Sequence, residues 1–260
     1  MTADFDDYAD SYGEAVGRSV AFAGQDVDHY ARRKVAHLLD LVRRRVGDPR
    51  RVSALDVGCG IGITDSFLAD HLGGLHGVDT AADAVERAAA RNPTVRYQAY
   101  DGAVLPFPDG AVDVAFAVCV AHHVELDERP AFAAELRRVV RPGGLVVLFE
   151  HNPLNPLTRV AVSRCEFDRG VVLLTRQHAS ALLASAGLLV AERRFIVFLP
   201  VEGRASHQVD RALRHVPFGA QHYVAAHRPL VDGAVAGATV LGLDGGRDVG
   251  GGARFRGGGE

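Results

Sequence analysis

Continuous apolar stretches alternate with amphipathic stretches along the middle of the chain. Because strands buried in a parallel sheet are apolar throughout, five of these stretches predict strands. They cover residues 52–57, 75–79, 95–99, 112–120 and 145–149. Segments with helical periodicity lie between them, near 63–72, 81–91 and 129–141. This alternation predicts an α/β, doubly wound parallel sheet with a ligand at the carboxyl ends of its strands.

The segments on either side of this core have their own patterns. In residues 1–50, which we expect to form helices that cover the site, Val35, Leu38, Leu39 and Val42 form a helical apolar stripe. Two prolines in 151–157 prevent a strand there, so we expect 151–174 to be an insertion over the ligand face.

The rest of the chain completes the domain and adds a tail. We expect a helix over 176–186 that stops at Gly187, and two final strands over 188–199 and 219–226. The main domain is predicted to span 51–230. Residues 231–260 are rich in glycine and poor in apolar side chains, so we expect them to be disordered.

Three alternating glycines, Gly58, Gly60 and Gly62, follow the first predicted strand. Glycine lets a backbone turn sharply and approach a ligand closely. Asp56 lies inside the end of this strand, where a carboxylate would repel a pyrophosphate but suits an ammonium group. The loop therefore predicts a ligand that carries a positive charge.

Carboxylates also end the next two predicted strands. Asp79 follows Gly62 by 17 residues, and a carboxylate at this point can accept both hydroxyls of a ribose. Asp101 and Gly102 close the third strand. The pattern G-x-G-x-x-G of nicotinamide cofactor sites is incomplete, because Ile63 stands where its third glycine belongs.

Taken in order, these residues resemble the class I S-adenosylmethionine (SAM)-dependent methyltransferases. The resemblance is strong over about 52–150, and the run LPFPDGAVD and the motif RPGG before a strand fit it as well. It implies a Rossmann-like, mostly parallel seven-stranded sheet with an antiparallel last strand, and SAM as cofactor. It also implies that Asp56 and the glycine loop hold the methionyl part, Asp79 the ribose, and Asp101 with Gly102 the adenine.

Further cofactor contacts follow from position in the family pattern. Tyr8 and Tyr12 resemble the N-terminal aromatic segment with which relatives cover the cofactor, although they could equally pack on one another. The remaining candidates are Cys59 in the loop, Thr80 after Asp79, and Cys119 on the fourth strand.

Histidines near the strand ends are the candidate bases. Methylation of a hydroxyl usually needs proton removal, and imidazole is suited to this near neutral pH. His122 and His123 follow the fourth strand, and His151 follows the fifth. The first two could instead form a structural junction. We predict no metal, because Glu150, His151 and Asn152 are adjacent on an extended segment and point to different faces.

Composition narrows the class of acceptor. The net charge is −3, and no Lys/Arg cluster is interleaved with aromatic residues, so nucleic acid is not expected as a partner. No apolar run is long enough to cross a membrane, and three cysteines without metal-ligand spacing suit a reducing compartment. We expect a cytoplasmic enzyme with a small-molecule substrate, of an oligomeric state that the sequence does not determine.

Two other functions stay open at this point. A SAM-binding protein of this fold could catalyse a reaction without methyl transfer, such as ring closure. An NAD-dependent oxidoreductase is less favoured, because of Ile63 and the Asp101–Gly102 pair.

Overall fold

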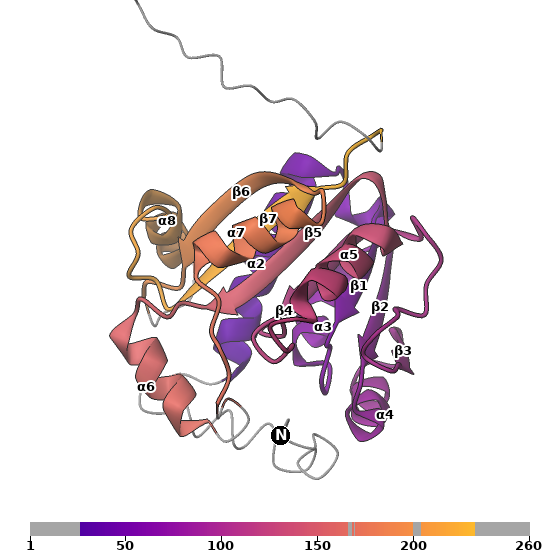
Figure 1. Cartoon of the computed structure of the whole chain (residues 1–260), viewed down its shortest axis with the longest axis horizontal. Helices are drawn as coiled ribbons and strands as arrows, with labels where there is room; N and C mark the ends of the chain where they lie inside the picture. The colour runs from indigo at the N-terminus through magenta and orange to yellow at the C-terminus, as the bar shows by residue number, and fades with distance from the viewer. Residues whose placement is uncertain (1–26, 166–167, 169, 200–203, 232–260) are drawn as a thin grey trace, which may run out of the picture.

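The computed structural model describes residues 27–165, 168, 170–199 and 204–231, which are built around one seven-stranded sheet (Figure 1). The strand order is β3-β2-β1-β4-β5-β7-β6. Neighbouring strands from β3 to β5 are parallel, while β7 is antiparallel to both β5 and β6. The strands are β1 (Ser53–Val57), β2 (Gly74–Asp79), β3 (Arg96–Ala99), β4 (Val112–Val118), β5 (Val140–His151), β6 (Leu189–Ile196) and β7 (Gln221–His227). The predicted fold class is confirmed.

Seven α-helices and two 3-10 turns surround the sheet in the described part of the chain. They are α2 (Val27–Arg45), η3 (Pro49–Arg51), α3 (Ile63–Leu68), η4 (Ala69–His71), α4 (Ala82–Arg91), α5 (Arg129–Val139), α6 (Pro156–Arg164), α7 (Arg176–Ser185) and α8 (Arg204–Ala212). The sequence did not predict α6 or α8. It also placed one helix over 63–72, where the structure has α3 followed by the tighter turn η4.

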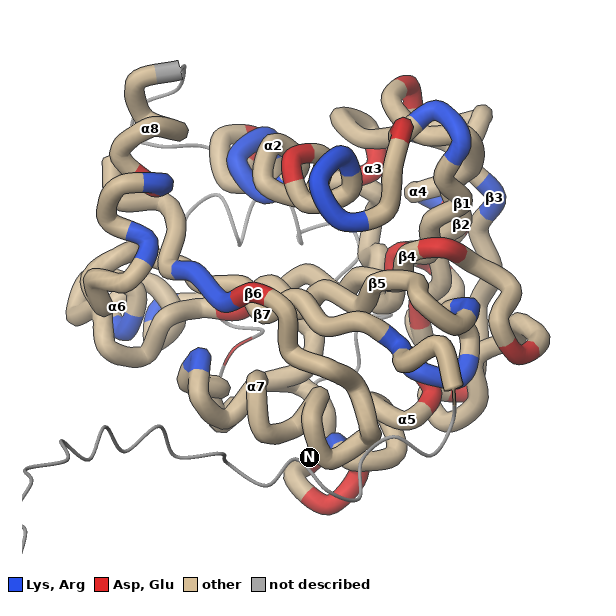
Figure 2. The backbone as a smooth tube through the Cα atoms, turned by 90° about the horizontal axis from the view of Figure 1, so that it is seen from above, with Lys and Arg blue, Asp and Glu red and all other residues tan. Residues whose placement is uncertain are grey.

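The alternation of side chains along β4 shows how one strand serves two cores. Ala115 and Ala117 pack toward α5 and α7, whereas Val114 and Phe116 pack toward α2 and α3. All four are at most 1% exposed, because helices cover the sheet on both faces. Figure 2 shows α2 and α3 on one side of the sheet, with α5 and α7 on the other.

A buried carboxylate joins α8 to α2 across the end of the sheet. Asp210 accepts hydrogen bonds from the Arg33 guanidinium and from His37 Nε2, the latter at 2.9 Å. It also accepts the backbone N–H groups of Val197 and Phe198, each at 3.1 Å. Although burial raises the pKa of Asp210, these donors hold it below its ordinary value. A fully buried charge that is paired in this way fixes the two helices relative to one another.

No helix in the described residues is both long and apolar enough to cross a bilayer. α2, with 19 residues, is the longest described helix, and it carries Arg33, Lys34 and a run of three arginines at its end.

We predict that Asp210→Asn destabilises the fold by about 3–5 kcal/mol, because it leaves buried donors without their charged acceptor. Urea unfolding at pH 7 measures this loss. The difference in the free energy of unfolding between wild type and variant should be largest above pH 3.9, which is about the pKa of aspartate in an unfolded chain. It should decrease as the pH falls below that value. Asp109→Asn, at an exposed carboxylate, is the matched control. Equal urea midpoints for Asp210→Asn and wild type would contradict the prediction.

Candidate functional site

The candidate site lies at the carboxyl ends of β1, β4 and β5. β1 lies between β2 and β4, so the chain leaves the sheet in opposite directions on its two sides. In open α/β sheets this arrangement opens a crevice at the strand ends. A cavity of about 350 Å³ lies there, between the glycine loop, α2, α6 and the segments that flank β6 and β7.

The glycine loop is shaped by close packing as much as by its turn. Gly58 adopts φ +79°, and a Cβ on it would lie 2.4 Å from a methyl group of Val120. Gly62 adopts φ +72° and is the N-cap of α3, where a Cβ would meet the Asn92 amide at 2.5 Å. A side chain at either position would clash and strain the backbone. Gly58 and Gly60 line the cavity, whereas Gly62 supports the loop from behind.

Asp56 places a buried acid on the glycine-loop side of the cavity. It is 2% exposed and lines the cavity, and its Oδ1 has no hydrogen-bond partner among the described residues. Burial raises its pKa well above the ordinary value, and the neighbouring carboxylate of Asp65 raises it further. Burial likewise raises the pKa of Asp65 to about 6. A bound ammonium group would supply both the donor and the charge that Asp56 lacks, so the residue fits the methionyl end of SAM.

The predicted ribose and adenine contacts lie at or after the ends of β2 and β3, and none of them lines this cavity. Asp79 accepts the backbone N–H groups of Gly60 at 2.7 Å and Ala81 at 3.0 Å, which ties the glycine loop to the end of β2. Asp101 is exposed and accepts the N–H groups of the two residues after Gly102. Their contacts with ribose and adenine stay predictions, as do those of Thr80 and Gly102. Tyr8 and Tyr12 lie outside the described residues.

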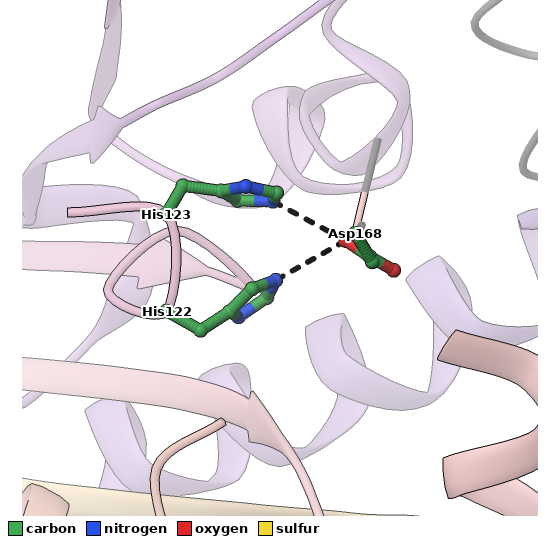
Figure 3. A group of neighbouring side chains, drawn as sticks. All are labelled: His122, His123 and Asp168. Carbon is green, nitrogen blue, oxygen red and sulfur yellow. Dashed lines mark hydrogen bonds and ion pairs between the residues drawn. The ribbon is translucent and has the colours of Figure 1, made fainter. Parts of the chain in front are cut away.

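His122 is buried behind the cavity in a chain of charged groups. Its Nδ1 lies 2.6 Å from Glu150 Oε2. Figure 3 shows its other nitrogen, Nε2, which lies 3.4 Å from Asp168 Oδ1. Burial opposes its positive charge, but the two carboxylates outweigh burial and raise the pKa of His122 to about 10. An imidazole that is already protonated at pH 7 is a poor proton acceptor. Of the three predicted bases, His122 is therefore the least suited to that role.

His123 and His151 both line the cavity and are electrostatically different from His122. The Nε2 of His123 lies 3.4 Å from Asp168 Oδ1, and its side chain is 23% exposed. Burial lowers its pKa, and the charge of His122 lowers it further. Burial and the same charge lower the pKa of His151 to about 4. Both imidazoles are therefore neutral at pH 7, and His123 has the contact with a carboxylate that stabilises a transferred proton.

Several cavity residues were missed by the sequence analysis. Lys34 of α2 and Gln221 of β7 are at most 8% exposed and line the cavity, and the Oε1 of Gln221 has no partner among the described residues. Asp168 has no sequence signal, since only the fold brings it to the histidines. The start of α6 did have a sequence signal, because Asn155 followed by Pro156 is typical of a helix N-terminus. In the structure the Asn155 side chain accepts hydrogen bonds from the N–H groups of Leu157 and Thr158.

The far wall of the cavity is apolar and comes from α6 and from the segments next to β6 and β7. It is formed by Leu157, Val162, Val197, Phe198, Leu199 and Phe218. Two cavity residues, Cys119 and Val197, are the non-glycine residues with positive φ in the described chain, at 58° and 60°. A β-branched residue in this region is strained, and such strain gathers at ligand sites.

The predicted cysteine contacts both reach the cavity. Cys59 lies in the glycine loop and Cys119 follows β4, and each lines the cavity wall. Burial raises the pKa of both thiols, so they are packing groups in the protonated form rather than nucleophiles.

Comparison with known proteins agrees with this geometry. Residues 55–148 match the family described as "Methyltransferase domain". The 2-methyl-6-phytyl-1,4-hydroquinone methyltransferase of Synechocystis sp. is 37% identical over 108 residues, which cover 40% of this chain and 33% of that protein. The ubiquinone biosynthesis O-methyltransferase of Methylobacterium nodulans is 27% identical over 217 residues, 76% of this chain and 84% of that protein.

The fold itself recurs in solved structures. That of the [4+2]-cyclase SpnF superposes with a TM-score of 0.53 at 22% identity, over 75% of this chain and 82% of that one. A match at this identity shows a shared fold. Residues 55–148 are therefore a methyltransferase domain, and the strand order and the glycine loop are those of the class I SAM-dependent methyltransferases, whose cofactor is SAM.

Proposed function

We propose that this protein transfers the methyl group of SAM to a small-molecule acceptor that binds in the cavity beside His123. The observation that carries the proposal is that one cavity joins two unlike surfaces. On one side are the glycine loop and Asp56, and on the other is the apolar wall of α6, with His123 and His151 also on its lining. A volume of about 350 Å³ is in the range of small-molecule sites.

The two sides have different roles in this proposal. Asp56 binds the ammonium group of SAM, and Asp79, at the end of β2, binds the ribose. The bound cofactor supplies an electrophilic methyl group on a sulfonium. The apolar wall excludes water and holds an acceptor with a largely apolar body, so that the reacting atom stays in line with that methyl.

His123 takes the proton of the acceptor in this mechanism. It is neutral near pH 7, it lines the cavity, and Asp168 can stabilise the imidazolium that forms. An acceptor with an ionisable hydroxyl suits this arrangement. The Synechocystis and Methylobacterium relatives carry names of quinone-type methyltransferases, so hydroquinones and other phenols with apolar substituents are the first acceptors to test.

The alternative is a reaction without methyl transfer in the same cavity. The fold that this chain shares with the cyclase SpnF is compatible with such a reaction. Incubation with SAM and a panel of substituted hydroquinones, followed by mass spectrometry, separates the two. A product heavier by one methylene unit supports methyl transfer. A converted compound of unchanged mass, with SAM intact, would contradict it.

We predict that Asp56→Asn weakens the binding of S-adenosylhomocysteine by about 10- to 100-fold, since a charged hydrogen bond contributes about 1.5–3 kcal/mol. The melting temperature of the free protein should stay the same or rise, because the buried acid has an unpaired oxygen there. Isothermal titration and thermal melting measure the two effects. Asp83→Asn, at an exposed acid on α4, is the control. Wild-type affinity in Asp56→Asn would show that the ammonium group binds elsewhere.

We predict that His123→Gln lowers turnover of an identified acceptor by about 10²- to 10⁴-fold, the usual contribution of a general base. Binding of S-adenosylhomocysteine should not change. Wild-type turnover should fall at acid pH with a pKa below 6.5, because burial lowers the pKa of His123, and this limb should vanish in the variant.

The matched control for this test is His178→Gln, an exposed histidine on α7. Turnover and a pH profile in His123→Gln that equal those of wild type would exclude His123 as the base. The same measurements on His151→Gln would then decide whether the second imidazole of the cavity takes the proton.

A further inference from the structure

Two adjacent histidines and one aspartate converge from distant parts of the chain beside the cavity. His122 and His123 lie in the turn after β4, and Asp168 lies after α6 (Figure 3). The Nε2 atoms of both histidines are 3.4 Å from the same oxygen, Asp168 Oδ1. One ligand atom from each of the three residues lies within 4.8 Å of the others.

The distances from Asp168 to the two histidines are long for hydrogen bonds, and they are also those expected between two ligands of one metal ion. A charge-assisted N–H···O bond is about 2.7–2.9 Å long, so 3.4 Å is too long for a good one. Ligand atoms bound at about 2.0–2.2 Å to one tetrahedral ion are about 3.3–3.6 Å apart. The distance from Asp168 Oδ1 to each imidazole nitrogen is therefore that expected between two ligand atoms of one tetrahedral ion.

Glu150 orients one of these ligands. The Nδ1 of His122 lies 2.6 Å from Glu150 Oε2, and Oε1 of the same carboxylate accepts the N–H of Ala121 at 2.9 Å. With Nδ1–H directed at Glu150, the Nε2 of His122 is the nitrogen that faces Asp168. A carboxylate behind a ligating imidazole is the usual support of a metal-bound histidine.

Charge and ligand type indicate which ions fit. A metal ion at Nε2 of His122 would displace the proton from that nitrogen, and the carboxylates of Glu150 and Asp168, at most 10% exposed, would then leave two negative charges that a divalent cation balances. Two imidazoles and one carboxylate suit zinc, iron(II), cobalt and nickel. Magnesium and calcium prefer oxygen ligands.

We propose that His122, His123 and Asp168 bind one divalent first-row transition metal ion at the edge of the cavity. His123 and Asp168 line the cavity while His122 supports them from behind, so a remaining coordination position faces the bound acceptor. A hydroxyl group at that position would lose its proton more readily. This last role rests on the proposed function. In the metal-loaded protein the Nε2 of His123 would be bound to the ion, so His151 would take the proton instead, and the role of His123 as base applies to the metal-free protein.

Cobalt(II) is the probe that tests the site without any acceptor. The full chain is treated with EDTA, freed of chelator and titrated with CoCl₂, while visible absorption and bound cobalt per chain are measured. We expect one Co²⁺ per chain with d–d bands typical of four or five ligands. Zinc should displace it. Asp168→Asn and His123→Gln should each weaken binding by at least about tenfold, and Glu150→Gln by about 10- to 100-fold.

His71→Gln and Asp83→Asn, at exposed residues far from the cluster in sequence, are the matched controls and should bind Co²⁺ like wild type. Circular dichroism and S-adenosylhomocysteine binding show that each variant is folded. A wild-type protein that binds no Co²⁺ at millimolar concentration, or ligand variants that bind it as wild type does, would overturn the proposal. Neither result would contradict methyl transfer, because that proposal is tested separately by the mass of the product.

Azide tests the open position. It binds where a coordination site is accessible, so its addition should shift the cobalt spectrum of the wild-type protein. A Co²⁺ complex whose spectrum azide does not change would overturn the role of the ion in acceptor binding.

Discussion

Burying the carboxylate of Glu150 at the end of β5 is the constraint on which the polar side of the site depends. A buried charge needs hydrogen-bond donors and a counter-charge. Ala121 N–H and His122 meet this need, and they fix the turn after β4 in position. That turn carries His123 into the cavity, and the second nitrogen of His122 faces Asp168 beyond α6. One buried acid therefore links β4, β5 and the segment that follows α6.

On the glycine-loop side of the cavity, the buried acid Asp56 lacks the partners that Glu150 has in the described part of the chain. Asp56 is as deeply buried as Glu150, but its Oδ1 lacks a hydrogen-bond partner among the described residues, and the charges of Asp65 and Asp79 raise its pKa while that of Lys34 only partly opposes them. Such an arrangement lowers the stability of the free protein, and a cationic ligand removes the penalty. A buried acid with partners therefore organises the protein behind the cavity, and a buried acid with an unpartnered oxygen among the described residues lines the cavity, where we propose that it binds the ammonium group of SAM.

The apolar wall lowers the polarity of the space in which these two sides meet. α6 begins at a capped turn, with Asn155 as N-cap and Pro156 at the first helical position, and it lays Leu157 and Val162 over the strand ends. Asp210 holds the segment after β6 through the N–H groups of Val197 and Phe198, which complete the wall. Low polarity around the reacting atoms strengthens every electrostatic interaction described above.

The sequence by itself determined the sheet, the glycine loop and the positions of Asp56, His123 and His151, because these depend on local patterns: apolar runs, turn glycines and residues at strand ends. It also indicated that a segment after β5 could not be a strand. Only the tertiary structure decided that His122 is charged and His123 neutral. Both contact Asp168, at least 45 residues away, but His122 also contacts Glu150, which is 28 residues away. Lys34 and Gln221 likewise reach the cavity through helix and strand packing, which no local pattern encodes.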